Sequence, residues 1–295
     1  MIDMKIGMVV NTLHNMSLEE IAQWASSVGL ENFELPAGPG SRLCDPDRIL
    51  AGNAGEVRSA VDQAGIQISA INYATNHLDP NPEKRDANNA YMRKVIEAAA
   101  QLEVPNVMCF VGGDLGKGFM ENMGLFEDHF LPLLAHAKDN GVKLCIENCP
   151  AGGWNIANNP AVLRELFVAA DDLAGSMALE FDPSHAVWLQ LDYLKFAEEF
   201  APRTCLMHAK DTIVDNTTLS ENGIMGVVKS WWSYKIPGRG VINWPELLQV
   251  MHDGGFDGPI HIEHEDSEYS GSEEKQKQGL LIGLEILRGA IADLT

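Results

Sequence analysis

The chain has 295 residues and a formal charge of −21, from 21 Lys and Arg residues against 42 Asp and Glu residues. A surface this acidic repels phosphate backbones and anionic headgroups, which argues against general binding of nucleic acids or membrane surfaces. Hydrophobic residues make up 45% of the sequence and charged residues 21%, the composition of a globular rather than a disordered protein.

The cysteine pattern and the N-terminus bear on the compartment. The chain has an odd number of cysteines, partly in apolar runs and without Cys-x-x-Cys or zinc-finger spacing: Cys44, Cys109, Cys145, Cys149 and Cys205. We therefore expect reduced core cysteines in a reducing compartment. The first residues, 1–5, lack a secretory signal pattern, and no apolar run of ~18 residues occurs. These features favour the cytoplasm.

The dominant pattern along the chain is a short apolar run followed by a loop and a segment with helical spacing. Eight such units occur, and the short runs have the Ile-, Val- and Phe-rich character of buried parallel strands. The predicted strands are Lys5–Val10, Asn32–Pro36, Gln67–Tyr73, Asn106–Val111, Lys143–Asn148, Ala178–Asp182, Cys205–Lys210 and Pro259–Glu263.

The intervening helices have recognisable start signals. Ser17 and Glu20 form a capping-box pattern ahead of the first helix, and Asn159-Pro160 places a cap before a proline. Pro245-Glu246 opens another helix, and the last one is predicted from about Glu273 to Ala292.

Eight strand–helix units predict a single (β/α)₈ barrel over residues 1–295. A doubly wound open sheet is the rival, but the first strand lacks a glycine-rich dinucleotide turn. One connection, 212–244, is much longer than usual and contains Trp231, Trp232 and Tyr234. Such an excursion after the seventh strand predicts a lid or binding loop, with a small subdomain or an oligomer contact as the alternative.

The last four predicted strands each end in polar residues, where the chemistry of such a barrel is located. Neighbouring strand ends lie close together, so Glu147, Asp182, His208 and Glu263 should converge. Three buried carboxylates would repel one another, and a divalent cation would relieve that repulsion and use the imidazole. The set suits Mn²⁺, Mg²⁺ or Co²⁺, with Zn²⁺ as a further option.

These motifs resemble the xylose-isomerase-like sugar isomerase/epimerase superfamily of metal-dependent barrels over nearly the whole chain. The resemblance rests on Ile-Glu147-Asn, Asp182-Pro-Ser-His185, His208-Ala-Lys-Asp211, the segment 238–244 and Ile-Glu263-His-Glu-Asp. It implies that Glu147, Asp182, His208 and Glu263 bind one catalytic divalent metal, often Mn²⁺. It also implies that His185 contacts a substrate oxygen.

The match to particular branches is uneven. Ketose 3-epimerases typically have a substrate-binding arginine six residues after the metal histidine, where this chain has Val214. The His-x-Lys-Asp ending is more similar to the inosose dehydratase branch. The Gly-Arg-Gly turn and the Glu-His-Glu-Asp ending are similar to proteins that act on oxidised sugars and glycosides.

A metal chelated by a keto sugar would acidify the neighbouring C–H and stabilise an enediolate. Glu147 and Glu263 are the candidate bases, and His185 and Lys210 can move or stabilise protons on substrate oxygens. Reprotonation gives epimerisation or isomerisation, which we favour. Expulsion of a β-leaving group gives a dehydratase or glycoside-cleaving lyase, the alternative.

Further candidates would contact a carbohydrate substrate. His14, Asn72 and His77 follow predicted strands and can bond hydroxyls, Trp232 can stack on a ring, and Arg239 lies between two glycines. Structural roles explain each of them equally well.

Two readings outside simple isomerase chemistry stay open. One is a metal-containing scaffold that needs a partner subunit; a homo-oligomer is otherwise expected. The other is a DNA-repair nuclease, which the acidic charge and the lack of a wider histidine cluster oppose.

Overall fold

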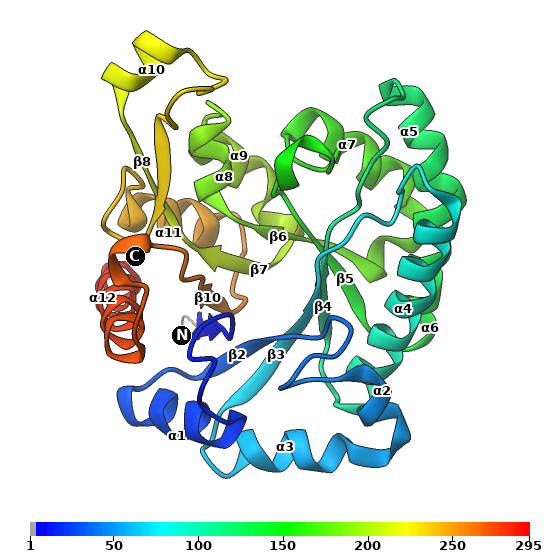
Figure 1. Ribbon diagram of the computed structural model, residues 1–295, viewed down its shortest axis with the longest axis horizontal. Helices are drawn as coiled ribbons and strands as arrows, with labels where there is room; N and C mark the ends of the chain where they lie inside the picture. Colours follow the sequence, from blue (N-terminus) through cyan, green and yellow to red (C-terminus); the bar gives the residue numbers. More distant parts are fainter. Residues whose placement is uncertain (1–3) are drawn as a thin grey trace.

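The computed structural model describes residues 4–295 and contains a closed barrel of eight parallel strands surrounded by helices (Figure 1). The strand order around the barrel is β1-β10-β7-β6-β5-β4-β3-β2. The barrel strands are β1 (Ile6–Val9), β2 (Asn32–Pro36), β3 (Gln67–Tyr73), β4 (Asn106–Cys109), β5 (Lys143–Glu147), β6 (Met177–Phe181), β7 (Thr204–Ala209) and β10 (Ile260–Ile262). The predicted (β/α)₈ barrel is therefore confirmed and the open sheet is wrong. Residues 1–3 of the predicted domain lie outside the described part.

All eight predicted strands are present: two have the predicted bounds, four are one or two residues shorter, and two are shifted by one residue toward the N-terminus. The difference lies mainly at the carboxyl ends, where polar residues such as Asn148 and Asp182 leave the strand ladder and turn into the loops. These loops form the mouth of the barrel where the candidate site lies.

The helices begin at the caps that the sequence indicates. Ser17 accepts from the backbone N–H of Glu20, whose carboxylate in turn accepts from the Ser17 N–H, and Asn159 caps its helix through the Val162 N–H. The helices are α1 (Leu18–Val28), α2 (Pro46–Arg48), α3 (Ala54–Asp62), α4 (Pro82–Gln101), α5 (Phe119–Leu125), α6 (Leu131–Asp139), α7 (Pro160–Ala169), α8 (Pro183–Trp188), α9 (Tyr193–Phe200), α10 (Asn216–Asn222), α11 (Trp244–Asp253) and α12 (Glu273–Ala292). The bounds of α12 match the prediction. Within residues 4–295, no helix is both long and apolar enough to span a bilayer.

The long segment 212–244 is an ordered insertion. It contains an antiparallel pair, β8 (Asp211–Val214) and β9 (Trp232–Lys235), with α10 between them. In Figure 1 this insertion, in yellow, extends beyond the barrel. The side chains of Trp231 and Ile236 are buried, so the hairpin is anchored at both ends of β9.

The barrel interior is layered, as the inward side chains of alternating strand positions require. One apolar group consists of Ala70, Cys145, Ala178 and Leu206. Beside it, Cys145 of β5 and Cys205 of β7 lie close together, with Cα atoms 6.9 Å apart, although they are 60 residues apart in the sequence. That these two cysteines are reduced stays a prediction. Cys44, Cys109 and Cys149 are free.

Candidate metal centre

Four side chains converge at the carboxyl-terminal mouth of the barrel. Glu147 ends β5, Asp182 follows β6, His208 lies in β7 and Glu263 follows β10. Each offers one ligand atom, and these atoms all lie within 4.8 Å of one another. Asp182 and His208 are fully buried, and the Glu263 side chain is 15% exposed. The predicted group of four metal ligands is therefore brought together.

The local structure aims Asp182 at this group. The Asn148 side chain accepts from the Asp182 N–H at 2.7 Å and donates to its carbonyl at 2.8 Å, which ties the ends of β5 and β6 together. Oδ1 of Asp182 caps α8 by accepting from the Ser184 N–H at 2.8 Å. Its Oδ2 is buried without a hydrogen-bond partner and faces the other ligands. One oxygen is thus structural, and the other is available to a cation.

His185 connects the ligands to the inserted hairpin. Its Nε2 lies 3.2 Å from Oε1 of Glu147 and 3.2 Å from Oδ2 of Asp182. Its Nδ1 lies 2.9 Å from the hydroxyl of Tyr234 on β9. The ring is 1% exposed. His185 therefore lies beside the candidate ligands, while its role at a substrate oxygen stays a prediction; its contact with Tyr234 was not predicted.

Lys210 supplies the positive charge among these carboxylates. Its Nζ lies 2.5 Å from Glu263, 3.1 Å from Oδ2 of Asp182 and 3.0 Å from Glu265, and 4.4 Å from the centre of the Tyr234 ring. Although burial alone lowers the pKa of Lys210, the surrounding carboxylates outweigh it and raise the pKa well above its ordinary value. The lysine is therefore charged in this position.

The electrostatics keep the carboxylates ionised. Burial raises the pKa of Glu147, but hydrogen bonds from His185 and His208 outweigh it and lower the pKa to about 2. Burial is similarly outweighed at Glu263, where Lys210 and His208 hold the pKa well below its usual range. Ionised oxygen ligands with one imidazole are what a hard divalent cation requires.

A second, deeper polar group was missed by the sequence reasoning. Glu34 on β2, Glu180 on β6 and His261 on β10 surround the same His208 and are fully buried. A signal was present in the sequence, because Glu180 and His261 stand two residues before Asp182 and Glu263. Side chains two apart in a strand point to the same side, so both pairs point into the barrel.

Aromatic side chains form a wall beside the mouth. Trp232 of β9 stacks on Trp188 of α8, with ring centres 4.5 Å apart and an angle of 4° between the planes. The Trp188 indole N–H donates to the Tyr234 hydroxyl at 3.1 Å. Trp232 is half-buried. Trp188 was not predicted, although it follows His185 by one helical turn.

The other predicted substrate-binding residues are not gathered into this group. His14 is exposed in the loop after β1, and Arg239 faces Glu268 and the Tyr269 ring. Asn72 donates to Glu34 at 2.7 Å, so it supports the deeper group. His77 is fully buried and bonds Asn89 through Nδ1.

The last residue of the His-Ala-Lys-Asp motif holds the segment 238–244 in place. The Asp211 carboxylate accepts from the backbone N–H groups of Thr212, Gly238 and Ile242 and from the indole N–H of Trp244, at 2.8 to 3.1 Å. The two motifs noted separately in the sequence are therefore one structural unit at the base of the insertion.

Comparisons with known proteins agree with this architecture. A curated relative, the uncharacterized protein YfiH of Bacillus subtilis, is 24% identical over 89% of this chain and 93% of its own length. The solved structure of the 3-keto-D-glucoside 4-epimerase YcjR from E. coli is 16% identical with a TM-score of 0.73, covering 97% of this chain and 99% of that one. The probable 3-DHS dehydratase AsbF from Bacillus anthracis is 14% identical with a TM-score of 0.73, covering 97% and 99%.

At these identities the solved structures establish the fold alone. The family model described as xylose isomerase-like TIM barrel matches residues 22–288, which is most of the chain. With its closed parallel barrel and the ligand group at the carboxyl-terminal mouth, the chain belongs to the xylose isomerase-like TIM barrel family.

Proposed function

We propose that this protein is a divalent-metal-dependent sugar isomerase or epimerase that acts on a keto sugar or sugar derivative through an enediolate. The observation that carries the proposal is the convergence of Glu147, Asp182, His208 and Glu263, whose ligand atoms lie within 4.8 Å of one another at the barrel mouth.

The donor set fits a divalent metal ion. The three carboxylates are hard ligands and the imidazole is a borderline one, a combination that divalent metal ions accept. In addition, Oδ2 of Asp182 is buried and has no hydrogen-bond partner among the described residues. The ammonium of Lys210 already contacts two of these carboxylates, so the site is arranged around positive charge. We expect Mn²⁺, with Mg²⁺, Co²⁺ and Zn²⁺ as alternatives.

A bound divalent ion supplies Lewis acidity that polarises a substrate carbonyl and lowers the pKa of the adjacent C–H. Glu147 and Glu263 both contribute to the candidate metal centre and are ionised, so either can accept a proton from a sugar carbon. Epimerisation requires that the other carboxylate first takes up a proton from solvent and then donates it to the opposite face of the same carbon, while the first carboxylate keeps the proton it removed and later releases it to solvent. Lys210 and His185 hold or move protons at the substrate oxygens, as charge develops there.

The aromatic wall is the proposed sugar contact. Trp188 and Trp232 present stacked rings beside His185, and apolar C–H faces of sugars pack on such surfaces. We propose that the insertion 212–244 covers the substrate and that Trp232 contacts it. His14 in the neighbouring loop remains a candidate for a hydroxyl contact.

A lyase is the second candidate, because the same carbanion expels a leaving group at the β position. The lyase is supported by the similarity in fold to a probable 3-DHS dehydratase. It is also supported by Val214, which stands where ketose 3-epimerases have a substrate-binding arginine. The substrate can then be an inosose or a 3-oxo-glycoside.

We also propose that the protein associates with another chain, either a second copy of itself or a partner subunit. The tip of the insertion exposes four apolar side chains, Ile224, Met225, Val227 and Val228, between 72% and 88%. Light scattering of the pure protein, and assays with and without the product of a neighbouring gene, test whether another chain covers this tip.

The test combines metal analysis with solvent-deuterium exchange into a panel of keto sugars and 3-oxo-glycosides. We expect exchange by the metal-loaded protein and its loss in Glu147→Gln and Glu263→Gln, with an unchanged circular dichroism spectrum. Glu285→Gln, on an exposed part of α12, is the matched control. An epimer or isomer among the products supports the first candidate, and an unsaturated product supports the lyase.

Lack of exchange with every sugar, together with cleavage of abasic DNA at low salt, would overturn the proposal in favour of a nuclease. Exchange only when a second polypeptide is added would support the scaffold alternative.

A further inference from the structure

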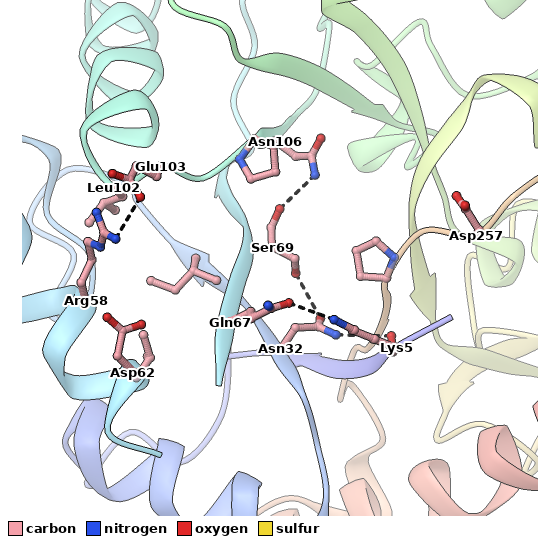
Figure 2. A pocket seen from close by; sticks show the side chains of 14 residues that line it. Lys5, Asn32, Arg58, Asp62, Gln67, Ser69, Leu102, Glu103, Asn106 and Asp257 are labelled. Atoms are coloured by element: carbon pink, nitrogen blue, oxygen red, sulfur yellow. Dashed lines mark hydrogen bonds and ion pairs between the residues drawn. The ribbon is translucent and has the colours of Figure 1, made fainter. Parts of the chain in front are cut away.

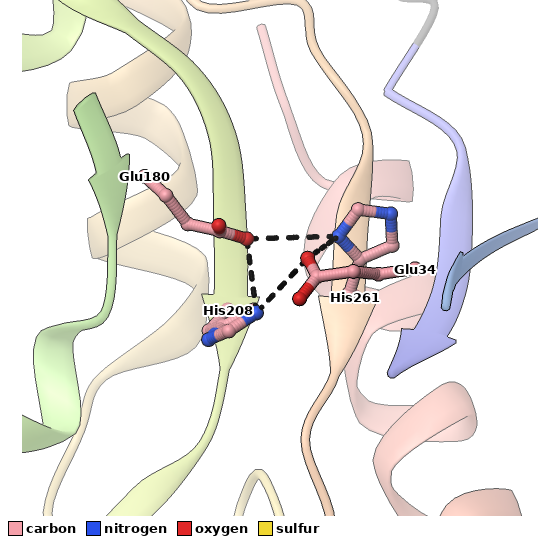
Figure 3. A group of neighbouring side chains, drawn as sticks. All are labelled: Glu34, Glu180, His208 and His261. Atoms are coloured by element: carbon pink, nitrogen blue, oxygen red, sulfur yellow. Dashed lines mark hydrogen bonds and ion pairs between the residues drawn. The ribbon is translucent and has the colours of Figure 1, made fainter. Parts of the chain in front are cut away.

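The deeper polar group has the composition of a metal site in its own right. Glu34, Glu180, His208 and His261 each offer one ligand atom within 4.8 Å of the others, and all four residues are fully buried. Figure 3 shows their side chains pointing toward a common centre from β2, β6, β7 and β10. Carboxylates packed this deeply are costly unless a proton or a cation neutralises them.

The hydrogen bonds of Ser69 determine which nitrogen of His261 faces this centre. The Ser69 hydroxyl has one proton, and two neighbouring atoms, Oδ1 of Asn32 at 3.0 Å and the carbonyl oxygen of Phe33 at 3.2 Å, can only accept it. Ser69 also lies 2.7 Å from Nε2 of His261, and we assign the proton of this contact to the histidine, which leaves the Ser69 proton for one of the two carbonyl oxygens. The proton is on Nε2, and Nδ1 presents a lone pair to the group.

The lone pair of Nδ1 has no hydrogen-bond partner in the described structure. Oε2 of Glu34 lies 3.4 Å away and Oε1 of Glu180 lies 3.9 Å away. Histidine ligands of metals commonly donate their other ring N–H to a nearby oxygen, as His261 does to Ser69. This arrangement is the one expected of a ligand.

Glu180 is the second unsatisfied group. Its Oε2 is buried without a hydrogen-bond partner, while its Oε1 lies 2.9 Å from Nε2 of His208. Burial and the neighbouring Glu34 raise the pKa of Glu180 well above its ordinary value. Glu34 is better satisfied, because Asn72 donates to its Oε1 at 2.7 Å and Nε2 of His208 lies 3.2 Å from its Oε2. Oε2 of Glu180 and Nδ1 of His261 therefore lack a hydrogen-bond partner among the described residues, in a group whose ligand atoms lie within 4.8 Å of one another.

We propose that Glu34, Glu180 and His261 bind a second divalent metal ion, below the one expected at the barrel mouth. Two carboxylates and one imidazole in a fully buried setting suit a structural Zn²⁺ or Mn²⁺ ion. His208 lies between the two sites. Its Nδ1 faces Glu147 and Glu263, and its Nε2 faces Glu34.

A cavity lies at the opposite end of the barrel from the mouth. It has a volume of about 480 Å³ and is lined by Ser69, Asn32, Asn106 and Asp62, among others. Figure 2 shows these polar side chains around the amino-terminal ends of the strands. Ser69 lines this cavity and also contacts His261 of the lower group.

The test counts metal ions, and it does not depend on any enzymatic activity. The full-length protein is stripped with a chelator, incubated with excess Zn²⁺ or Mn²⁺, desalted and analysed by elemental mass spectrometry. We expect two equivalents in the unmodified protein and in the control Glu285→Gln. One equivalent should remain in Glu147→Gln/Glu263→Gln, and one in Glu180→Gln/His261→Gln.

Co²⁺ provides a spectroscopic check on the same variants. The ligand-field absorption that remains in Glu147→Gln/Glu263→Gln should come from the lower site, and it should be absent from Glu180→Gln/His261→Gln. Anomalous diffraction from crystals of the unmodified protein locates the ions even where a variant fails to fold.

Three results would overturn the proposal. They are a single equivalent in the unmodified protein, two equivalents in Glu180→Gln/His261→Gln, or loss of all metal from that variant, which would mean that the lower group only positions His208. Failure of the isomerase proposal gives a different result, namely two bound ions without deuterium exchange.

Discussion

The hydroxyl of Tyr234 lies 2.9 Å from Nδ1 of His185 and joins the inserted hairpin to the candidate metal centre. The opposite nitrogen of the same ring contacts Glu147 and Asp182. The orientation of a histidine among the expected ligands therefore depends on a residue that the insertion contributes.

Tyr234→Phe removes this hydrogen bond and keeps the ring. We expect turnover to fall about 10–100-fold with little change in metal content, because His185 loses its orienting partner. Deuterium exchange into the best substrate of the sugar panel measures the change. Tyr269→Phe is the matched control, and equal rates for the two variants would contradict the role of Tyr234.

Lys210→Met tests the balance of charge at the mouth. Without the ammonium, Asp182 and Glu263 are left as uncompensated buried carboxylates, so the metal-free variant should lose about 3–5 kcal/mol of unfolding free energy. Addition of Mn²⁺ should restore more stability to the variant than to the unmodified protein. Urea unfolding with and without metal measures both effects.

The comparison variant for this measurement is Lys195→Met, whose side chain is 81% exposed and pairs only with Asp192 among the contacts described. It should change stability by less than about 1 kcal/mol. A Lys210→Met protein as stable as this control without metal would refute the assignment.

Gly240→Ala tests the joint between Asp211 and the segment 238–244. A Cβ at this position would lie 2.5 Å from the carbonyl oxygen of Thr212 and closer still to Oδ1 of Asp211. We expect a loss of about 1–3 kcal/mol from the forced displacement. Gly55→Ala, in α3 with open space around it, should instead gain about 0.5–1 kcal/mol. Thermal unfolding distinguishes the two variants. An unchanged stability of Gly240→Ala would show that the contact between Asp211 and the segment 238–244 is not tightly packed.

His77 should make stability depend on pH. Burial lowers its pKa to about 4, from an ordinary value near 6.5. Between these values the unfolded chain binds a proton that the folded chain does not, so the contribution to stability is full above pH 6.5 and falls as the pH drops. The loss reaches about 3 kcal/mol near pH 4.

His77→Gln removes this titration from both states. The stability of the unmodified protein relative to the variant should therefore decline from pH 7 to pH 4, as measured by urea unfolding at each pH. Parallel stability curves for the two proteins would contradict the buried, neutral state of His77.

The amino-acid sequence alone was sufficient for the order of the strands and helices and for the convergence of the four candidate ligands at the mouth. Those predictions rest on local rules: apolar runs form strands, caps start helices, and polar residues at the ends of parallel strands meet at one mouth. Glu147, Asp182, His208 and Glu263 could be found because each interrupts an apolar run at a strand end.

Only the tertiary structure decided what surrounds those ligands. Barrel closure places β2 opposite β6 and β7, which brings Glu34 to Glu180 and His208 although no short-range pattern relates them. The fold of the insertion brings Tyr234 to His185, and the interior packing places Cys145 beside Cys205. These contacts depend on the distances between elements after closure, and local propensity contains no information about those distances.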